Sequence, residues 1–346
     1  MNKDKNITIN ISTLTILKIL LIFLILTFLY LIREVVALIF VSLILASALD
    51  PWVDWLYKKK IPRGFSILAI YLVIFSVIGL AIYLVIPPVA NEIKDISQNF
   101  PVYYEKVVQA YERFKDIGDF RGSTQVQETL GTIGNNVAEA AGSLVNSVFN
   151  IFGGIVSFFL ILVITFYFTV QEEGLKRFFR SITPTKHQPY VSQLIVRMQR
   201  RMGLWLRGQL ILSLVIFVLV FTGLTILGVK YALLLAFLAG VLEIIPFLGP
   251  TLSAIPAIFL TLSHSPLKAL FVAILYFVIQ QLENQIIVPK IMGKSVDLNP
   301  LIVIIVILMG VKLGGFVGAL LAVPVATAIS VFLKDVFQAK EQNELS

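Results

Sequence analysis

The sequence predicts an all-α, polytopic integral membrane protein, and three observations carry that prediction. Hydrophobic residues make up 58% of the chain and charged residues only 14%, against about 45 to 50% and about 25% in soluble proteins. Apolar runs near the length of about 20 residues that a spanning helix needs recur along the chain. Proline and glycine interrupt two of the later runs, which favours about eight membrane segments, including two interrupted hairpins of the re-entrant type.

Residues 1–88 predict an N-terminal unit of three spans. These spans are expected at residues 14–32, 35–49 and 65–86. The first run is long and no small-residue cleavage site follows it, so we interpret it as a retained span rather than a signal peptide. Tryptophans and three lysines at 58–60 follow the second run, which suits the cytoplasmic interface. The third span is expected to end at Pro87 and Pro88, on the opposite side.

Residues 89–143 predict a small helical hairpin outside the membrane. Apolar side chains recur there at helical spacing, as at Val107, Tyr111 and Phe114. Acidic residues outnumber basic ones in this insertion, which fits the translocated side, although acids contribute little to topology. Residues 144–171 then predict a fourth span that returns to the cytoplasmic side.

Residues 172–205 form a strongly basic segment that we expect on the cytoplasmic side. Two glutamates face a larger set of bases in and just beyond it, namely Lys176, Arg177, Arg180, Lys186, Arg197, Arg200, Arg201 and Arg207. Within residues 189–205, apolar side chains alternate with the arginines. This pattern predicts a basic amphipathic helix on an anionic leaflet, and membrane anchoring is favoured over a substrate role.

Residues 206–340 predict a transport core made of two similar units. Each unit has one span and one interrupted hairpin, with spans at 206–227 and 267–288 and hairpins at 231–262 and 300–333. Opposite orientations of the two units would produce the inverted repeat of many secondary transporters. The last residues, 341–346, are expected to form a disordered tail.

Glu243 and the break that follows it are the strongest functional signal in the sequence. Pro246 and Pro250 cannot donate a backbone hydrogen bond and, with Gly249, interrupt the helix. An ionised carboxylate at bilayer depth costs about 2.5 to 3.5 kcal/mol on insertion scales. Broken helices with such a residue are typical of secondary transporters, so we expect Glu243 to line a solvent-reachable cavity and to carry a proton or cation.

A polar group near the end of the span at 267–288 predicts the second part of the site. Gln280, Glu283 and Asn284 fall at i, i+3 and i+4 and are expected to share one helix face. Exposure of that face to lipid would leave polar groups unsatisfied, so it should meet protein, water or ligand. The alternative is an interfacial cap at the cytoplasmic end of the helix.

Two further polar residues are candidates for substrate or ion binding, each with a structural alternative. Gln209 lies early in its span and is expected either to hydrogen-bond between helices or to reach the ligand. Asn299 either binds ligand or caps the second hairpin. Glu243 has a structural alternative as well, an ion pair with Arg207 or Lys230 that only holds the fold together.

Proline and glycine residues are expected to form the breaks and hinges of the core. These are Pro246, Gly249, Pro250, Pro289, Pro300, Gly310, Gly314 and Gly315. The chain has no cysteine, and its sequence shows no metal-ligand spacing, catalytic constellation or phosphate-binding fingerprint. We therefore expect no enzyme activity, no metal, no cofactor and no ATP-driven pump.

Several segments resemble the autoinducer-2 exporter (AI-2E) family of bacterial permeases. They lie at residues 49–64, 207–210, 227–250, 280–300 and 318–324, in the order of the family. The resemblance covers nearly the whole chain. It implies an eight-span-type permease with a soluble insertion after the third span, homo-oligomeric, which exports a small solute such as an autoinducer-2-like signalling molecule. Other members resemble Na⁺(Li⁺)/H⁺ antiporters, and Glu243, where members often have Asn or another polar residue, favours ion coupling.

These observations predict a gradient-driven secondary transporter, proton- or sodium-coupled, in the bacterial cytoplasmic membrane with both termini in the cytoplasm. The alternatives are a Na⁺(Li⁺)/H⁺ antiporter, an oligomeric channel, or a scaffold that docks through residues 89–143. The expected partners are the lipid bilayer, a small-molecule or ion substrate and further copies of the chain. The formal charge of +8 lies mainly at the ends of apolar runs, so it predicts membrane orientation rather than nucleic-acid binding.

Overall fold

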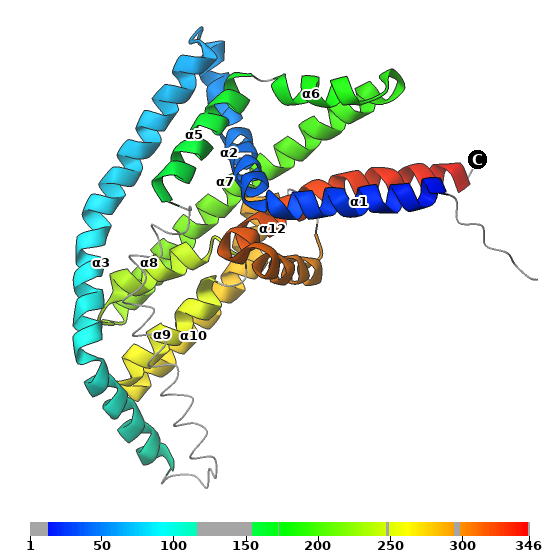
Figure 1. Ribbon diagram of the computed structural model, residues 1–346. Coiled ribbons are helices and arrows are strands. Elements are labelled where there is room, and N and C mark those ends of the chain that lie inside the picture. Colours follow the sequence, from blue (N-terminus) through cyan, green and yellow to red (C-terminus); the bar gives the residue numbers. More distant parts are fainter. Residues whose placement is uncertain (1–12, 116–153, 172, 247–248, 294–297, 345–346) are drawn as a thin grey trace, which may run out of the picture.

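The computed structural model describes residues 13–115, 154–171, 173–246, 249–293 and 298–344, and these contain helices and turns but no strand. The helices are α1 (Thr13–Leu31), α2 (Arg33–Lys58), α3 (Arg63–Lys115), α5 (Gly154–Val170), α6 (Gly174–Ile182), η1 (Thr185–His187), α7 (Gln188–Ile226), α8 (Ala232–Leu242), α9 (Gly249–Leu262), α10 (Pro266–Leu282), η2 (Glu283–Ile287), α11 (Val288–Met292) and α12 (Pro300–Glu344) (Figure 1). The predicted all-α class is confirmed.

Five of the described helical segments are long and apolar enough to cross a membrane. They lie in α2, α3, α7, α12 and the run from α10 to α11, and the bent α5–α6 pair makes a sixth if it counts as one span. The expected number of about eight is not reached by this count. One reason is that α8 and α9 are apolar but each too short to span a bilayer.

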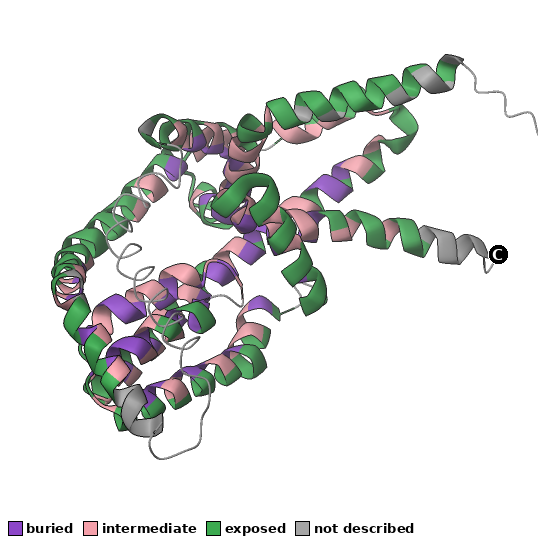
Figure 2. Cartoon of the chain, turned by 60° about the horizontal axis from the view of Figure 1, so that its bottom comes forward, coloured by how far each residue is buried: buried purple, intermediate pink, exposed green. Residues whose placement is uncertain are grey.

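One packed unit consists of α2, α3 and α5, which bond to each other through hydroxyl groups. The Ser42 hydroxyl of α2 donates to the carbonyl oxygen of Ile161 at 3.3 Å, and Thr165 donates back to the Ser42 carbonyl at 3.3 Å. Tyr71 of α3 donates to Leu162 at 2.9 Å. Such bonds hold helices together where burial against lipid gives no driving force. By contrast, α1 extends away from this unit and is exposed along its described side chains (Figure 2).

Helix α3 does not stop at its prolines. It continues through Pro87, Pro88 and Pro101 to Lys115 as one long helix along the edge of the molecule (Figure 1), so the helix extends past the expected end of the span near residue 86. A helix passes proline where neighbouring groups and local curvature accommodate the missing N–H. The first part of the expected hairpin is therefore an extension of α3, while residues 116–143, and 144–153 of the fourth span, lie outside the described residues.

The basic segment and the fifth span form one helix. The sequence predicted a surface helix at 189–205 separate from a span at 206–227, but α7 runs from Gln188 to Ile226 without a break. No proline interrupts the junction, so the helical hydrogen bonds continue. Along its second half, Leu212, Ile216, Val220 and Leu224 recur every four residues and are fully or almost fully buried. This stripe makes α7 the central element of the main core, against which α8 and α10 pack.

The first interrupted hairpin has the expected form. Helix α8 ends at Leu242, α9 begins at Gly249, and the two helices pack against each other. Between them the chain makes tight turns, in which the N–H of Ile245 donates to the carbonyl of Leu242 at 3.1 Å. The predicted interruption around Pro246 is confirmed.

The second hairpin is folded more tightly than the first. Gly314 and Gly315 leave the helical conformation inside α12, and Gly315 has a φ of 60°, a left-handed value that favours glycine. The two arms meet at Gly310 and Gly318, where a Cβ atom on either residue would overlap the carbonyl oxygen of the other. Helix α12 then continues to Glu344, so residues 341–344, expected in a disordered tail, are helical.

A polar network ties α3 to the start of α8. Lys230 pairs with Asp95 at 2.8 Å, and the Tyr231 hydroxyl donates to the same carboxylate at 2.6 Å. The hydroxyls of Tyr103 and Tyr231 lie 2.7 Å apart. The bond to Asp95 raises the pKa of Lys230 above its usual range. Asp95 and Tyr103 lie in α3, whereas Lys230 and Tyr231 directly precede α8. The network therefore holds the part of α3 around residues 95–103 against the core.

We expect Gly318→Ala to destabilise the protein, because the new methyl group would push the two arms of α12 apart. The cost of such overpacking is about 1 to 3 kcal/mol, which thermal unfolding in detergent would register as a lower midpoint. Gly79→Ala is the matched control, since a Cβ there meets nothing within 4 Å. Equal midpoints for the two variants would contradict the close approach.

Asp95→Ala should loosen α3 from the core, because it removes both the ion pair with Lys230 and the acceptor of Tyr231. We expect faster hydrogen exchange in residues 92–107. Lys94→Ala changes an exposed neighbour and should leave exchange as in the wild type. Unchanged protection in Asp95→Ala would show that the network does not hold α3.

Candidate functional site

The buried polar atoms that lack a hydrogen-bond partner gather in one part of the core. Among the described residues they are Gln209 Oε1, Ser213 Oγ, Glu243 Oε2, Tyr276 OH and Glu283 Oε2. They come from α7, the break between α8 and α9, α10 and η2. Buried polar groups are normally satisfied, so each exception requires an explanation. A concentration of exceptions around a broken helix marks this region as the candidate site.

Glu243 and Gln209 form the centre of the site. The side chain of Glu243 is 0% exposed and that of Gln209 is 1% exposed. The amide Nε2 of Gln209 donates to the backbone carbonyl of Glu243 and lies 3.5 Å from its carboxylate Oε1. Gln209 thus satisfies a carbonyl freed by the end of α8, and it orients the acidic side chain at the break. Of the two expectations for Gln209, the hydrogen bond between helices is confirmed.

Glu283 brings a second carboxylate into the core. Its side chain is 1% exposed, and it lies close enough to Glu243 for their charges to interact. Glu283 starts the π-turn η2, in which the N–H of Val288 donates to the carbonyl of Glu283 five residues earlier. Pro289 has no N–H for the next α-helical bond, which accounts for the wider turn here. Turns of this kind are frequent at functional sites.

Close packing of α9 holds Glu243 in place. A Cβ atom at Gly249 would overlap the Oε2 atom of Glu243 and come within 2.8 Å of its backbone nitrogen. One turn later, the buried Ser253 donates to the carbonyl of Gly249 at 2.7 Å and faces Tyr276 of α10. The predicted role of Gly249 at the break therefore has a steric basis, since only glycine leaves room for the carboxylate.

The structural ion pair considered for Glu243 is not formed. Lys230 binds Asp95 instead. Arg207 donates from Nε to the carbonyl of Gly203 at 3.1 Å, and its charge lies near Asp50. The acidic side chain at the break is thus held by an amide, which leaves its charge uncompensated by either base.

The three residues of the expected shared face, Gln280, Glu283 and Asn284, differ in burial. Glu283 is buried, Gln280 is half-buried and its Oε1 accepts from Thr251 at 3.1 Å, while Asn284 is exposed. Asn299 is also exposed, and its side chain accepts from the N–H of Leu301 at 2.9 Å. This is the capping alternative, with Pro300 at the start of α12.

The site is enclosed in this conformation. The sequence predicted that Glu243 lines a solvent-reachable cavity, whereas the structure buries it completely. Gln209 of α7 and Gly249 of α9 lie directly against Glu243. Access to the carboxylates therefore requires movement of at least one of these helices.

Sequence reasoning missed two members of the site, Ser213 and Tyr276. Both carried a signal, since Ser213 lies four residues after Gln209 and Tyr276 seven residues before Glu283, on the same helix faces. The described residues contain no group of three or more His, Cys, Asp or Glu side chains that could hold a metal ion. The oxygen atoms present, two carboxylates and an amide, suit a proton or a hard monovalent cation.

Comparisons with known proteins identify relatives along nearly the whole chain. The family described as AI-2E family transporter matches residues 18–338. "Putative transport protein YrrI" of Bacillus subtilis (strain 168) is 28% identical over 304 residues, which cover 85% of this chain and 84% of that protein. "Putative transport protein YhhT" of Escherichia coli (strain K12) is 21% identical over 302 residues, 87% and 84% of the two chains.

We expect Gln209→Leu to destabilise the core, because the freed carbonyl of Glu243 would remain buried without a donor. An unsatisfied buried group costs about 1 to 3 kcal/mol, measurable as a lower midpoint of thermal unfolding. Asn284→Leu makes a similar change at an exposed position and should leave the midpoint near the wild-type value. A larger loss in Asn284→Leu than in Gln209→Leu would contradict the geometry of the site.

Proposed function

The chain belongs to the AI-2E family of transporters, and from this premise we propose that it is a cation-coupled secondary transporter that exports a small solute. The observation that carries the proposal is the buried pair Glu243 and Glu283, each with an unpartnered carboxylate oxygen. A carboxylate in a dry core is maintained by function rather than by stability, because an apolar residue there would cost less.

The two carboxylates support coupling to a cation. Two acidic groups close together in an apolar core cannot both stay charged without a compensating positive charge. A proton on either group, or a sodium ion between them, supplies that charge. Gln209 contributes the unpartnered Oε1 as a further neutral oxygen ligand. Release of the cation would restore the repulsion, so loading and emptying of the site would favour different conformations.

The two interrupted hairpins support alternating access. The break at residues 243–248 and the turn at Gly314 and Gly315 interrupt helices inside the core, and interruptions of this kind serve as hinges in transporters. In this proposal the described conformation is an occluded one. Residues 206–340 would move as the transport core against the N-terminal unit of residues 1–88 and the fourth span at 144–171.

Membrane orientation follows from the charges near the ends of the helices. Lysines 58–60, the basic segment 172–205 and Lys334 support a cytoplasmic location of these parts, and of both termini, in the bacterial cytoplasmic membrane. The exposed apolar surface of α1 supports contact with lipid or with further copies of the chain. The insertion 89–143 would then lie outside the cell.

A second candidate is a Na⁺(Li⁺)/H⁺ antiporter, in which the cation is itself the cargo. The same pair of carboxylates favours it, because competition between a proton and a metal ion for shared oxygen atoms is sufficient for exchange. The two candidates differ in whether an organic solute is required for cation movement.

Glu243→Gln should abolish cation coupling while the fold is kept. In proteoliposomes with imposed proton or sodium gradients, cation flux followed by a pH-sensitive dye should fall by about tenfold or more, because the neutral amide cannot exchange a proton. Glu283→Gln should give a similar loss. Glu105→Gln is the control, since it makes the same change at an exposed residue of α3.

Unaltered gradient-driven flux in Glu243→Gln, with normal melting and oligomer size, would remove the carrier role. Unitary current steps in the wild type would indicate a channel instead. Flux that needs no organic solute would assign the antiporter.

A further inference from the structure

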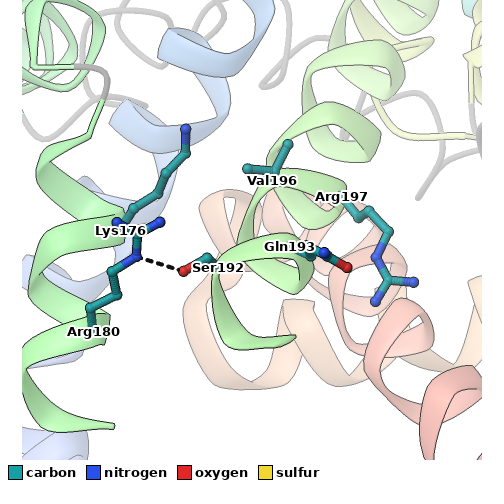
Figure 3. A pocket seen from close by; sticks show the side chains of 6 residues that line it. All are labelled: Lys176, Arg180, Ser192, Gln193, Val196 and Arg197. Carbon is teal, nitrogen blue, oxygen red and sulfur yellow. Dashed lines mark hydrogen bonds between the residues drawn. The ribbon is translucent and has the colours of Figure 1, made fainter. Parts of the chain in front are cut away.

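A second, separate feature is a basic cleft between α6 and the start of α7. It is lined by Lys176, Arg180, Ser192, Gln193, Val196 and Arg197 (Figure 3). We call it the α6–α7 cleft. It shares no residue with the core site, and the proposed transport cycle does not use it. Its concentration of positive charge on two packed helices calls for an anionic occupant.

The charged groups of the α6–α7 cleft are oriented rather than loosely placed. Arg180 donates from Nε to the Ser192 hydroxyl at 2.9 Å, and Ser192 donates in turn to the carbonyl of Gln188 at 2.8 Å. This bond directs the guanidinium of Arg180 toward α7 (Figure 3). The terminal amino groups of Arg180 and the ammonium of Lys176 have no hydrogen-bond partner among the described residues, so both remain available to a ligand.

The positive charge of Arg197, at the end of the cleft away from α6, is compensated by an acidic residue. Arg197 forms a two-point ion pair with Asp335 of α12, with one N–O distance of 2.9 Å. The uncompensated charge of the cleft therefore comes from Lys176 and Arg180. Two cations with directed N–H groups match the several oxygen acceptors of a phosphate group, which binds arginine through two parallel hydrogen bonds.

Helix α6 indicates where that phosphate comes from. Its apolar side chains Phe178 and Ile182 are 60% and 64% exposed, and they lie on the side of the helix opposite to Lys176 and Arg180. A short helix with one exposed apolar face and one basic face lies at the membrane surface, with the apolar face among the acyl chains. The cleft is thereby at the depth of the lipid headgroups.

We propose that the α6–α7 cleft binds the headgroup phosphate of an anionic phospholipid. The lipid phosphate is held between Lys176 and Arg180, with Ser192 as the residue that orients the guanidinium, while its acyl chains extend into the same leaflet that receives Phe178 and Ile182. Lipid bound here stabilises the junction between the bent α5–α6 segment and α7.

The test is lipid retention by the purified protein in neutral detergent, measured by native mass spectrometry with phosphatidylglycerol. Detergent removes the field of the bilayer surface, so retention reports a specific site. The double variant Lys176→Gln, Arg180→Gln should bind phosphatidylglycerol about thirtyfold more weakly. The control Arg177→Gln, Lys186→Gln loses the same charge from outside the cleft and should bind within about twofold of the wild type.

Equal losses in the two double variants would overturn the proposal, because they would show diffuse attraction without a site.

Photo-crosslinking of a phosphatidylglycerol analogue to the wild-type chain does not depend on variant folding. Adducts on α6 and residues 190–197 support the proposal, whereas adducts elsewhere refute it. A competition experiment with inorganic phosphate tests whether a soluble anion occupies the same cleft. If 10 mM phosphate, on the order of cellular concentrations, displaces the lipid fully, the cleft is a site for a free anion and the lipid assignment fails.

Discussion

The constraint on which the rest of the core depends is the need to satisfy backbone groups where a helix stops inside an apolar medium. Helix α8 ends at Leu242 with its last carbonyls deep in the protein, far from water that could bind them. Gln209 meets this need for Glu243, and it does so from α7. The break, the acid and the amide therefore form one unit, and the straight course of α7 is what brings them together.

Local helix defects assemble the remainder of the site. Glu283, where the π-turn before Pro289 begins, is buried in the core, whereas Asn284 is exposed. The approach of Gly249 encloses the carboxylate of Glu243. Each defect is small, but together they bury two acids near enough for their charges to interact, and neither Arg207 nor Lys230 pairs with Glu243. Such an arrangement is unfavourable for stability and useful for binding a cation that comes and goes.

The core is supported at two places by polar contacts from elsewhere in the chain. At one, α3 is bound to the start of α8 through Asp95 and Tyr231. At another, Arg197 links α7 to Asp335 of α12. Both contacts join helices from different parts of the chain, and neither involves the carboxylates of Glu243 and Glu283.

Composition and local chemistry determined the all-α membrane class, the break at Pro246 and the glycine turn at residues 314–315, because proline and glycine act on the backbone next to them. They also singled out Glu243, since an acid in an apolar run is anomalous in any fold. Tertiary structure decided what the acid contacts: Gln209 rather than Lys230, with Glu283 beside it and no open cavity. It also decided that α3 continues past its prolines. Those outcomes depend on which helices pack together, and hydropathy carries no information about partners.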